Sequence, residues 1–358
     1  MAAPLSPVDL DLVLAQTRDL WQEMRGQRVF ITGGTGFFGC WLVESFCHVN
    51  RALGLGARAT VLSRDPAKFA RKCPHLAGDP AVTLHAGDVR EFEFPAGEFR
   101  YVIHAATESG SKQAAEEMRS TIMAGTVRTL RFAAQCGARK FLLTSSGAVY
   151  GPQPAEISHL PETYECAPDA SNAYAAGKLA AEQSCAEQQR AARAQGLELE
   201  AKIARCWAFC GPHLPLDAHF AIGNFIGDAM AGRPISIASD GTPRRSYLYA
   251  ADLAAWLWTI LFRAPALVPI NVGSGRDVSI LQLAECVAAT LAPSTQIHVA
   301  KQAVPGALPM RYVPSVERAE RLLGLRQTVG LEDAIRRTAA WHGTGTGRRA
   351  PVRRVIRG

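Results

Sequence analysis

Long apolar segments and a secretion signal are missing from this chain. The most apolar stretch, residues 253–262, stops at Arg263 and is too short for a bilayer-spanning helix. Near the N-terminus, Asp9, Asp11 and Asp19 interrupt the region where a signal peptide would need an apolar core. We therefore expect a cytoplasmic protein with no membrane partner.

Closely spaced cysteine pairs are missing too, although the chain has nine cysteines. No CxxC pair occurs, and no pair of histidines completes a zinc set with Cys206 and Cys210, which stand four apart. Other cysteines, such as Cys47 and Cys136, lie in apolar surroundings. These observations predict buried thiols in a reducing compartment and no metal site.

Charge of one sign is scarce outside the C-terminal end. The formal net charge is +7, but five arginines fall after residue 347, and the rest of the chain is nearly neutral. Beside the Gly and Thr residues at 343–347, they predict a flexible basic tail over residues 343–358. This balance suits an anionic small-molecule substrate and gives no reason to expect a nucleic-acid partner.

Short apolar runs and helical periodicity alternate through the first half of the chain. Strands are expected at 28–32, 59–63, 82–85, 101–105, 141–144 and 201–206, and helices at 36–49, 113–136 and 172–194. Hydrophobic residues make up 48% of the chain, which is enough for a sizeable core. The alternation predicts an α/β fold with a Rossmann-type, doubly wound parallel sheet that is covered on both faces.

Changes in this pattern predict the domain organisation. Residues 1–27 are expected to form an N-terminal helical extension, and residues 28–206 a dinucleotide-binding domain. The alternation then breaks down, which predicts a smaller mixed α/β lobe for substrate over residues 207–342, with residues 243–273 partly returning to the first domain. Its helices are expected at 216–231, 251–262, 279–291, 316–323 and 331–341, and its strands near 234–238, 268–271 and 297–300.

A glycine-rich turn follows the first expected strand. Gly33, Gly36 and Gly39 have the spacing GxxGxxG, directly before an amphipathic helix. Such a turn lets the backbone approach a pyrophosphate, whose charge then meets the N–H groups at the start of the helix. The sequence therefore predicts a dinucleotide site that includes Gly33, Thr35, Gly36, Phe37, Phe38 and Gly39.

The end of the second expected strand bears on the choice of cofactor. An acidic residue there usually binds the ribose 2′-hydroxyl of NAD, but this chain has Ser63 followed by Arg64. A guanidinium can pair with a 2′-phosphate, so NADP is favoured over NAD. Asp65 keeps NAD as the alternative, because a small shift of the strand end would place an acid there.

A tyrosine and a lysine stand four residues apart on an expected helix. Tyr174 and Lys178 follow the strand that ends in Ser145 and Ser146, and their spacing places them on one helix face. With the segments TGGTGFFG, GDV (87–89), HAA (104–106), SSGAVYG, YAAGK, RSYLY (245–249) and NVG (271–273), the chain resembles the extended short-chain dehydrogenase/reductase family, in its nucleotide-sugar epimerase/dehydratase branch. This resemblance covers nearly all of the chain after residue 27.

The resemblance implies roles for these residues. Tyr174 is expected to be the acid–base group, Lys178 to lower its pKa and hold the nicotinamide ribose, and Ser146, with Ser145 as fallback, to bind the reacting oxygen. Further cofactor contacts are implied for Asp88, Val89, Ala105 and Ala106. Arg245 and Arg311 are implied to bind the substrate pyrophosphate, and Arg244 is an alternative to Arg245.

Several positions depart from the family pattern. The dehydratases carry Asp-Glu directly after the active Ser or Thr, where this chain has Gly147 and Ala148. Dehydration would then need a proton donor from elsewhere, such as Glu108, which is also a candidate substrate contact. Ala208 and Ile122 replace two Asn residues that the family often has. His213 and His219 are candidates to fill the first of these gaps.

These departures leave four functions open. The first is a 4-epimerase that oxidises and re-reduces C4 of a nucleoside-diphosphate sugar without net redox change. The second is an NADPH-dependent reductase of 4-keto sugars. A 4,6-dehydratase with displaced acid and base, and a non-catalytic NADP-binding protein, are the remaining alternatives. The resemblance also implies a homodimer formed through a four-helix interface.

Overall fold

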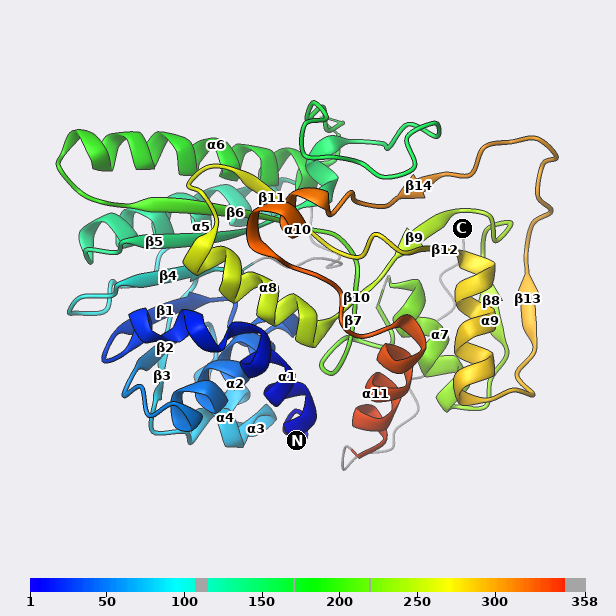
Figure 1. The fold of residues 1–358 in the computed structure, drawn as a ribbon, viewed down its shortest axis with the longest axis horizontal. Helices are drawn as coiled ribbons and strands as arrows, with labels where there is room; N and C mark the ends of the chain where they lie inside the picture. Colours follow the sequence, from blue (N-terminus) through cyan, green and yellow to red (C-terminus); the bar gives the residue numbers. More distant parts are fainter. Residues whose placement is uncertain (107–114, 170, 219, 345–358) are drawn as a thin grey trace.

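The computed structural model describes residues 1–106, 115–169, 171–218 and 220–344. Its centre is a seven-stranded sheet in the order β11-β6-β5-β4-β1-β2-β3, in which every pair of neighbours is parallel (Figure 1). The strands are β1 (Arg28–Thr32), β2 (Arg58–Ser63), β3 (Val82–Ala86), β4 (Tyr101–His104), β5 (Lys140–Ser146), β6 (Glu200–Cys206) and β11 (Pro269–Val272). The predicted Rossmann-type fold is confirmed, with β1 and β4 at the point where the strand order reverses.

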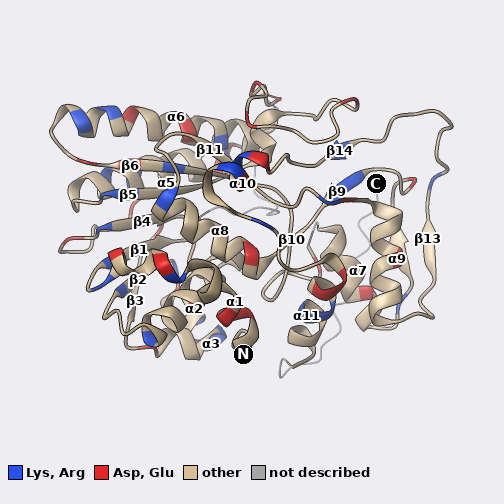
Figure 2. Ribbon diagram, viewed as in Figure 1, with Lys and Arg blue, Asp and Glu red and all other residues tan. Residues whose placement is uncertain are grey.

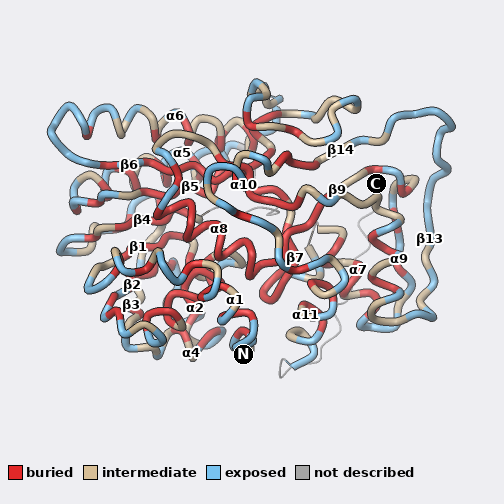
Figure 3. The backbone as a smooth tube through the Cα atoms, viewed as in Figure 1, coloured by how far each residue is buried: buried red, intermediate tan, exposed pale blue. Residues whose placement is uncertain are grey.

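Successive side chains of a strand point to opposite faces of the sheet and enter two separate hydrophobic cores. Val29 and Ile31 belong to one buried cluster and Phe30, between them, belongs to the other. Helices α1 (Pro7–Thr17), α2 (Phe37–Ala52) and α8 (Ala250–Arg263) contribute to the first cluster, while α5 (Ala115–Gln135) and α6 (Ala173–Ala194) cover the opposite face. Helix α8 is buried along almost its whole length, which explains its continuous apolar sequence (Figure 3).

Short helical segments complete this part of the chain. They are η1 (Arg18–Met24), α3 (Pro66–Lys72), α4 (Pro74–Ala77) and η2 (Gly147–Tyr150). Helix α3 begins where the Asp65 carboxylate accepts a hydrogen bond from the Lys68 N–H (2.8 Å) and Pro66 takes the first helical position. The side chain of Asp65 is therefore used as a helix cap.

The C-terminal half builds a smaller lobe from short strands and helices. Its strands form three small sheets: β7 (Phe209–Cys210) with β10 (Leu248–Tyr249), β8 (Ile235–Ile237) with β13 (Ile297–Val299), and β12 (Asp277–Ser279), β9 (Arg244–Ser246) and β14 (Arg311–Tyr312). Its helices are α7 (Ala221–Met230), α9 (Ile280–Leu291), α10 (Glu317–Leu323) and α11 (Leu331–Thr344). Helix α7 is shorter than the predicted 216–231, because residues 211–217 form a turn and a loop.

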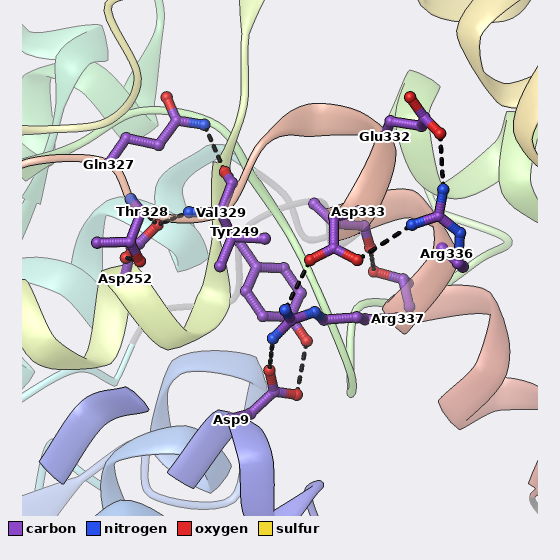
Figure 4. A network of polar contacts seen from close by, with 12 residues as sticks. Asp9, Tyr249, Asp252, Gln327, Thr328, Val329, Glu332, Asp333, Arg336 and Arg337 are labelled. Atoms are coloured by element: carbon purple, nitrogen blue, oxygen red, sulfur yellow. Dashed lines mark hydrogen bonds and ion pairs between the residues drawn. The ribbon is translucent and has the colours of Figure 1, made fainter. Parts of the chain in front are cut away.

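The first helix is joined to the last one by a buried polar contact. The Asp9 carboxylate accepts hydrogen bonds from the Tyr249 hydroxyl (2.8 Å) and from the Arg337 guanidinium (2.6 Å) (Figure 4). Trp341 adds a hydrogen bond from its indole N–H to the Ala3 carbonyl (3.1 Å). Segments from both ends of the sequence thus lie side by side. None of the helices in the described ranges has the length and apolar character that crossing a bilayer requires.

Candidate active site

A cavity of about 1140 Å³ opens at the carboxyl ends of the central strands, between the sheet and the smaller lobe. This volume exceeds that of a typical single-ligand pocket, so it can hold a dinucleotide and a substrate together. Most of the residues predicted for the site meet in its lining: Gly33, Thr35, Gly36, Phe37, Phe38, Arg64, Asp88, Val89, Ala105, Ala106, Ser146, Tyr174, Lys178 and Arg245. Of the other predicted residues, Gly39, Ser63 and Arg311 lie outside the lining, and Glu108 lies outside the described residues.

The glycine turn connects β1 to α2 and lies against β4. Gly33 has a positive φ of 71°, and a Cβ atom there would lie 2.4 Å from the Ala105 carbonyl carbon. A Cβ on Gly39 would lie 2.2 Å from the Gly33 oxygen, so neither position accepts a side chain. Helix α2 has no side-chain cap at its N-terminus, which leaves its first N–H groups available for a phosphate. The turn therefore fits a dinucleotide pyrophosphate.

Positively charged groups gather at the far end of the cavity, beyond β2. Arg64, Lys72 and Arg90 line it together with Asp88. Asp88 accepts hydrogen bonds from Nε (2.8 Å) and Nη2 (3.1 Å) of Arg90, and these bonds lower the pKa of its carboxyl. The Ser63 hydroxyl is buried and accepts from the N–H of Asp65 (3.3 Å). Neither Ser63 nor Asp65 lines the cavity, so its wall at this strand end is basic.

The predicted catalytic residues come from two adjacent elements. Ser146 ends β5, and Tyr174 and Lys178 lie one turn apart at the start of α6. Asn172 fixes this start, because its side chain accepts a hydrogen bond from the Ala175 N–H (3.1 Å). The Ser146 hydroxyl lies beside the phenol of Tyr174 and acts to lower its pKa, and the Lys178 ammonium donates to the Thr144 carbonyl (2.7 Å). The three side chains are thus assembled in one place.

Burial controls the protonation of these groups. It raises the pKa of Tyr174, while the Ser146 hydroxyl acts in the opposite direction. Burial also lowers the pKa of Lys178 to about 8, since its ammonium is withdrawn from water. We expected Lys178 and the positive nicotinamide ring to lower the phenol pKa together; in the protein alone, burial raises it. A positive charge near the hydroxyl, such as that of an oxidised nicotinamide ring, would act against this rise.

A second tyrosine, which the sequence argument missed, lies beside this set. Tyr312 on β14 lines the cavity beside Ser146, which acts to lower the pKa of its phenol, and its ring centroid lies 4.4 Å from that of Trp207. The strand pairing between β14 and β9 brings Tyr312 opposite Arg245, whose guanidinium lies 5.7 Å from the tyrosine ring centroid. The neighbouring Arg311, already singled out, was the only signal in the sequence.

The candidate phosphate-binding arginines separate into two groups (Figure 2 shows the basic strand β9). Arg245 lines the cavity, and its Nη1 donates to the Arg244 carbonyl (2.8 Å). Arg311 instead pairs with the Asp277 carboxylate (3.2 Å), which also pairs with Arg244. Arg245 is therefore the arginine of this group that faces the cavity, and a phosphate role for Arg311 stays a prediction.

Small residues, Gly147 and Ala148, occupy the two positions where dehydratases carry acid and base. A Cβ on Gly147 would lie 2.6 Å from the indole of Trp207, while Ala148 lines the cavity. Among the described residues of the lining, Asp88 and Glu117 are the carboxylates, and Asp88 is paired with Arg90. Glu117, in the first turn of α5, is a cavity residue that we did not predict.

His213 is the one of the two candidate histidines that the structure describes, since residue 219 lies outside the described ranges. It lines the cavity, and burial holds its pKa at about 3. A neutral imidazole of this kind cannot supply a proton near neutral pH. Ala208 also lines the cavity, and Ile122 is buried against Gly177 of α6.

Buried polar contacts hold the catalytic strand end in place. Arg205 on β6 forms a bidentate ion pair with Glu182 on α6 (Nη2–Oε2, 2.7 Å), and the Ser145 hydroxyl donates to the same carboxylate. Asn271 accepts hydrogen bonds from the Tyr150 hydroxyl (3.0 Å) and the Trp207 indole (3.1 Å). The hydroxyl of Ser145 is thus committed to this network, which leaves Ser146 as the serine beside Tyr174.

A parallel sheet that ends in such a cavity, with a tyrosine and a lysine one turn apart, defines a nicotinamide-dependent enzyme of the extended short-chain dehydrogenase/reductase class. Within that class, the profile of the NAD dependent epimerase/dehydratase family matches residues 29–273. The chain belongs to this family, as its sequence motifs predicted.

Characterised relatives with similar sequences act on nucleotide sugars. The chain is 27% identical over 317 residues to UDP-glucuronic acid decarboxylase 2 of Arabidopsis thaliana, covering 87% of this chain and 67% of that protein. It is 26% identical over 322 residues to UDP-glucuronic acid decarboxylase 1 of Xenopus tropicalis, covering 88% and 72%.

Solved structures show the same fold. UDP-N-acetylglucosamine 4-epimerase from Methanobrevibacter ruminantium superposes with a TM-score of 0.75 at 19% identity, over 90% of this chain and 99% of that one. UDP-glucose 4-epimerase from Thermotoga maritima superposes with a TM-score of 0.72 at 18% identity, over 88% and 99%.

Proposed function

We propose that the protein transfers a hydride at C4 of a nucleoside-diphosphate sugar and works as a 4-epimerase. The observation that carries this proposal is the pair Gly147 and Ala148 beside an assembled set of Ser146, Tyr174 and Lys178. Neither small residue can move a proton, and Trp207 fills the space beside Gly147. Redox chemistry at a hydroxyl carbon is thereby favoured over elimination of water.

Each residue of the site has its own role in this reaction. Tyr174 takes the proton of the sugar 4-hydroxyl and later returns it, and Ser146 holds the same oxygen by a hydrogen bond. Lys178 supplies a positive charge close to the phenol at pH values below about 8. A nicotinamide ring bound beside Tyr174 and Lys178 would supply the hydride acceptor and donor for C4. Arg245 faces the cavity and binds the anionic diphosphate of the substrate.

NADP is the proposed cofactor, with NAD as the alternative. Arg64 and Lys72 line the cavity beyond β2, where the adenosine ribose of a dinucleotide would lie. The one acid that could have bound a ribose 2′-hydroxyl here, Asp65, caps α3 instead. With the Asp65 carboxylate used as a cap and Asp88 paired with Arg90, Arg64 and Lys72 are the lining groups that suit a 2′-phosphate.

The same basic end supports a second candidate, an NADPH-dependent reductase of 4-keto sugars. A reductase consumes one NADPH per product, whereas an epimerase returns its hydride and consumes none. Incubating the purified protein with UDP-glucose, UDP-N-acetylglucosamine and UDP-glucuronate, and separately with a UDP-4-keto sugar and NADPH, separates the two. We expect a C4-epimeric product without net cofactor consumption.

Mass spectrometry of the ligands that stay bound during purification complements this assay. NADP is the expected cofactor. Release of CO₂ from UDP-glucuronate, or loss of water from any of the three sugars, would contradict the proposal. Binding of cofactor without turnover of the three sugars or of the UDP-4-keto sugar would favour a non-catalytic role.

The assembly and location of the protein are also proposals. Helices α5 and α6 lie next to each other on one face of the sheet (Figure 1). We propose a cytoplasmic homodimer in which these two helices pair with those of a second copy. Light scattering of the purified protein tests this, with a dimer mass expected and a monomer mass contradicting it.

A further inference from the structure

Two cysteines and a histidine meet close to the glycine turn, apart from the catalytic residues. Cys40 lies in the first turn of α2, Cys73 at the junction of α3 and α4, and His213 in the loop after β7. Their two Sγ atoms and one ring nitrogen all lie within 4.8 Å of one another, and all three residues are buried. The spacing of these residues in the sequence does not predict the group, because its members come from three distant segments.

His213 combines a buried imidazole that has no hydrogen-bond partner among the described residues with an unusual backbone conformation. Its side chain is only 8% exposed, and neither ring nitrogen has a hydrogen-bond partner in the described part of the chain. Its φ of 69° lies in the left-handed region, which residues other than glycine rarely adopt. The Trp41 indole donates to the preceding Pro212 carbonyl (3.0 Å), and the Trp341 ring lies 4.5 Å from the imidazole.

A buried imidazole without a hydrogen-bond partner lies next to two thiols, so the three side chains offer a set of potential metal ligands. Cysteine sulfur and histidine nitrogen are the ligands that zinc prefers. Around a tetrahedral zinc ion these ligand atoms would stand roughly 3.5–3.8 Å apart, so side-chain movements on the order of 1 Å close the set. We propose that Cys40, Cys73 and His213 bind one zinc ion, with water at the fourth position.

Such an ion would act on the cofactor turn. The Cys40 thiol now donates a hydrogen bond to the Thr35 carbonyl (3.7 Å), which also accepts one from the Lys72 ammonium (3.4 Å). A metal-bound thiolate has no proton to donate, so binding removes one of these two bonds. The ion would also tie α2, the α3–α4 junction and the loop of His213 together beside the bound dinucleotide.

Cobalt is the probe that tests this site directly. The full-length protein is reduced, freed of metal with a chelator and titrated with Co²⁺ while its absorption spectrum is recorded. We expect one Co²⁺ per chain, a thiolate-to-cobalt charge-transfer band, and loss of this band when Zn²⁺ is added. Absence of the band in the reduced wild-type protein would overturn the proposal, and this readout does not depend on enzyme turnover.

Matched variants identify the ligands. Cys40→Ser and Cys73→Ser should lose the band, while Cys47→Ser and Cys185→Ser, at buried cysteines outside the group, should keep it. His213→Gln should retain two thiolates and weaken Co²⁺ binding at least about tenfold. Zn²⁺ should raise the Tm of the wild-type protein and leave that of Cys40→Ser unchanged. An undiminished band in a folded Cys40→Ser variant would contradict the assignment.

Discussion

The indole of Trp207 lies 2.6 Å from the point that a Cβ atom on Gly147 would occupy. Trp207 cannot easily move away, because its N–H is bonded to Asn271 and its ring lies against Tyr312. The backbone at residue 147 is therefore closed to any side chain, including the aspartate that dehydratases carry there.

Gly147→Asp is expected to destabilise the protein by about 1–3 kcal/mol, because the new side chain must displace the indole. The free energy of unfolding in urea measures this effect. Ala148→Asp is the matched control: Ala148 faces the cavity, so the same side chain should cost much less there. Equal stability of Gly147→Asp and wild type would show that Trp207 yields without cost.

Tyr174→Phe is expected to lower turnover of the nucleotide sugar by at least about 10²-fold, the usual scale for a positioned acid–base group. The cofactor should remain bound, since only the phenol oxygen is removed. Steady-state kinetics and the cofactor content of the purified variant measure both effects. Tyr164→Phe, outside the cavity lining, serves as the control. Near-normal turnover of Tyr174→Phe would refute its catalytic role.

Tyr312→Phe should have a smaller effect. Its hydroxyl lies beside Ser146, so its loss removes at most one neutral hydrogen bond and leaves Tyr174 in place. We expect kcat/KM to fall about 2–10-fold, the equivalent of about 0.5–1.5 kcal/mol. A loss as large as that of Tyr174→Phe would mean that Tyr312 itself moves the proton.

Arg64→Ala is expected to weaken NADPH binding at least about tenfold, the loss of one charge-assisted hydrogen bond, and NADH binding much less. Titration of the cofactor-free protein with each dinucleotide measures the difference. Arg71→Ala, on the following helix α3 and outside the cavity lining, should affect neither. Equal weakening of both cofactors would show that Arg64 does not contact the 2′-phosphate.

Acid should destabilise the protein through His104. This residue is buried between Thr32 (2.8 Å) and Thr126 (3.0 Å), and burial lowers its pKa from 6.5 to about 3. At a pH between about 3 and 6.5, His104 is protonated in the unfolded chain but neutral in the folded protein. The free energy of unfolding therefore falls as the pH drops below 6.5. At pH 5 the loss from this group is about 2 kcal/mol.

His104→Gln should remove this part of the pH dependence, because glutamine does not titrate. Comparing urea unfolding at pH 7 and pH 5 gives the expected difference, and His298→Gln, on the exposed strand β13, is the control. A variant with the same acid sensitivity as the wild-type protein would place the loss elsewhere.

Local sequence signals were sufficient for the sheet, the glycine turn and the grouping of Ser146, Tyr174 and Lys178 at one cavity. Each of these depends on neighbours in the chain: the GxxGxxG spacing, the four-residue interval between Tyr174 and Lys178, and the apolar runs of the strands. The short helix α3 was missed because it depends on one cap, Asp65, and on Pro66 rather than on periodicity.

Contacts between distant segments could not be predicted from the sequence. Tyr312 enters the site because β14 pairs with β9, and a strand of two residues gives no periodic signal. The role of Asp65 was left open by its sequence position and was decided by its hydrogen bond to the Lys68 N–H. The group formed by Cys40, Cys73 and His213 could not be found by spacing, since three separate loops and helices bring it together.

The contact of Asp9 with Arg337 and Tyr249 has a consequence for how the protein is made. The arginine is synthesised 328 residues after the aspartate, so the Asp9 carboxylate leaves the ribosome long before its partner exists. Until then, α1 carries a charge that it cannot bury without cost. The polar contacts of α1 are therefore complete only once α11 has been made, although its apolar face can pack earlier.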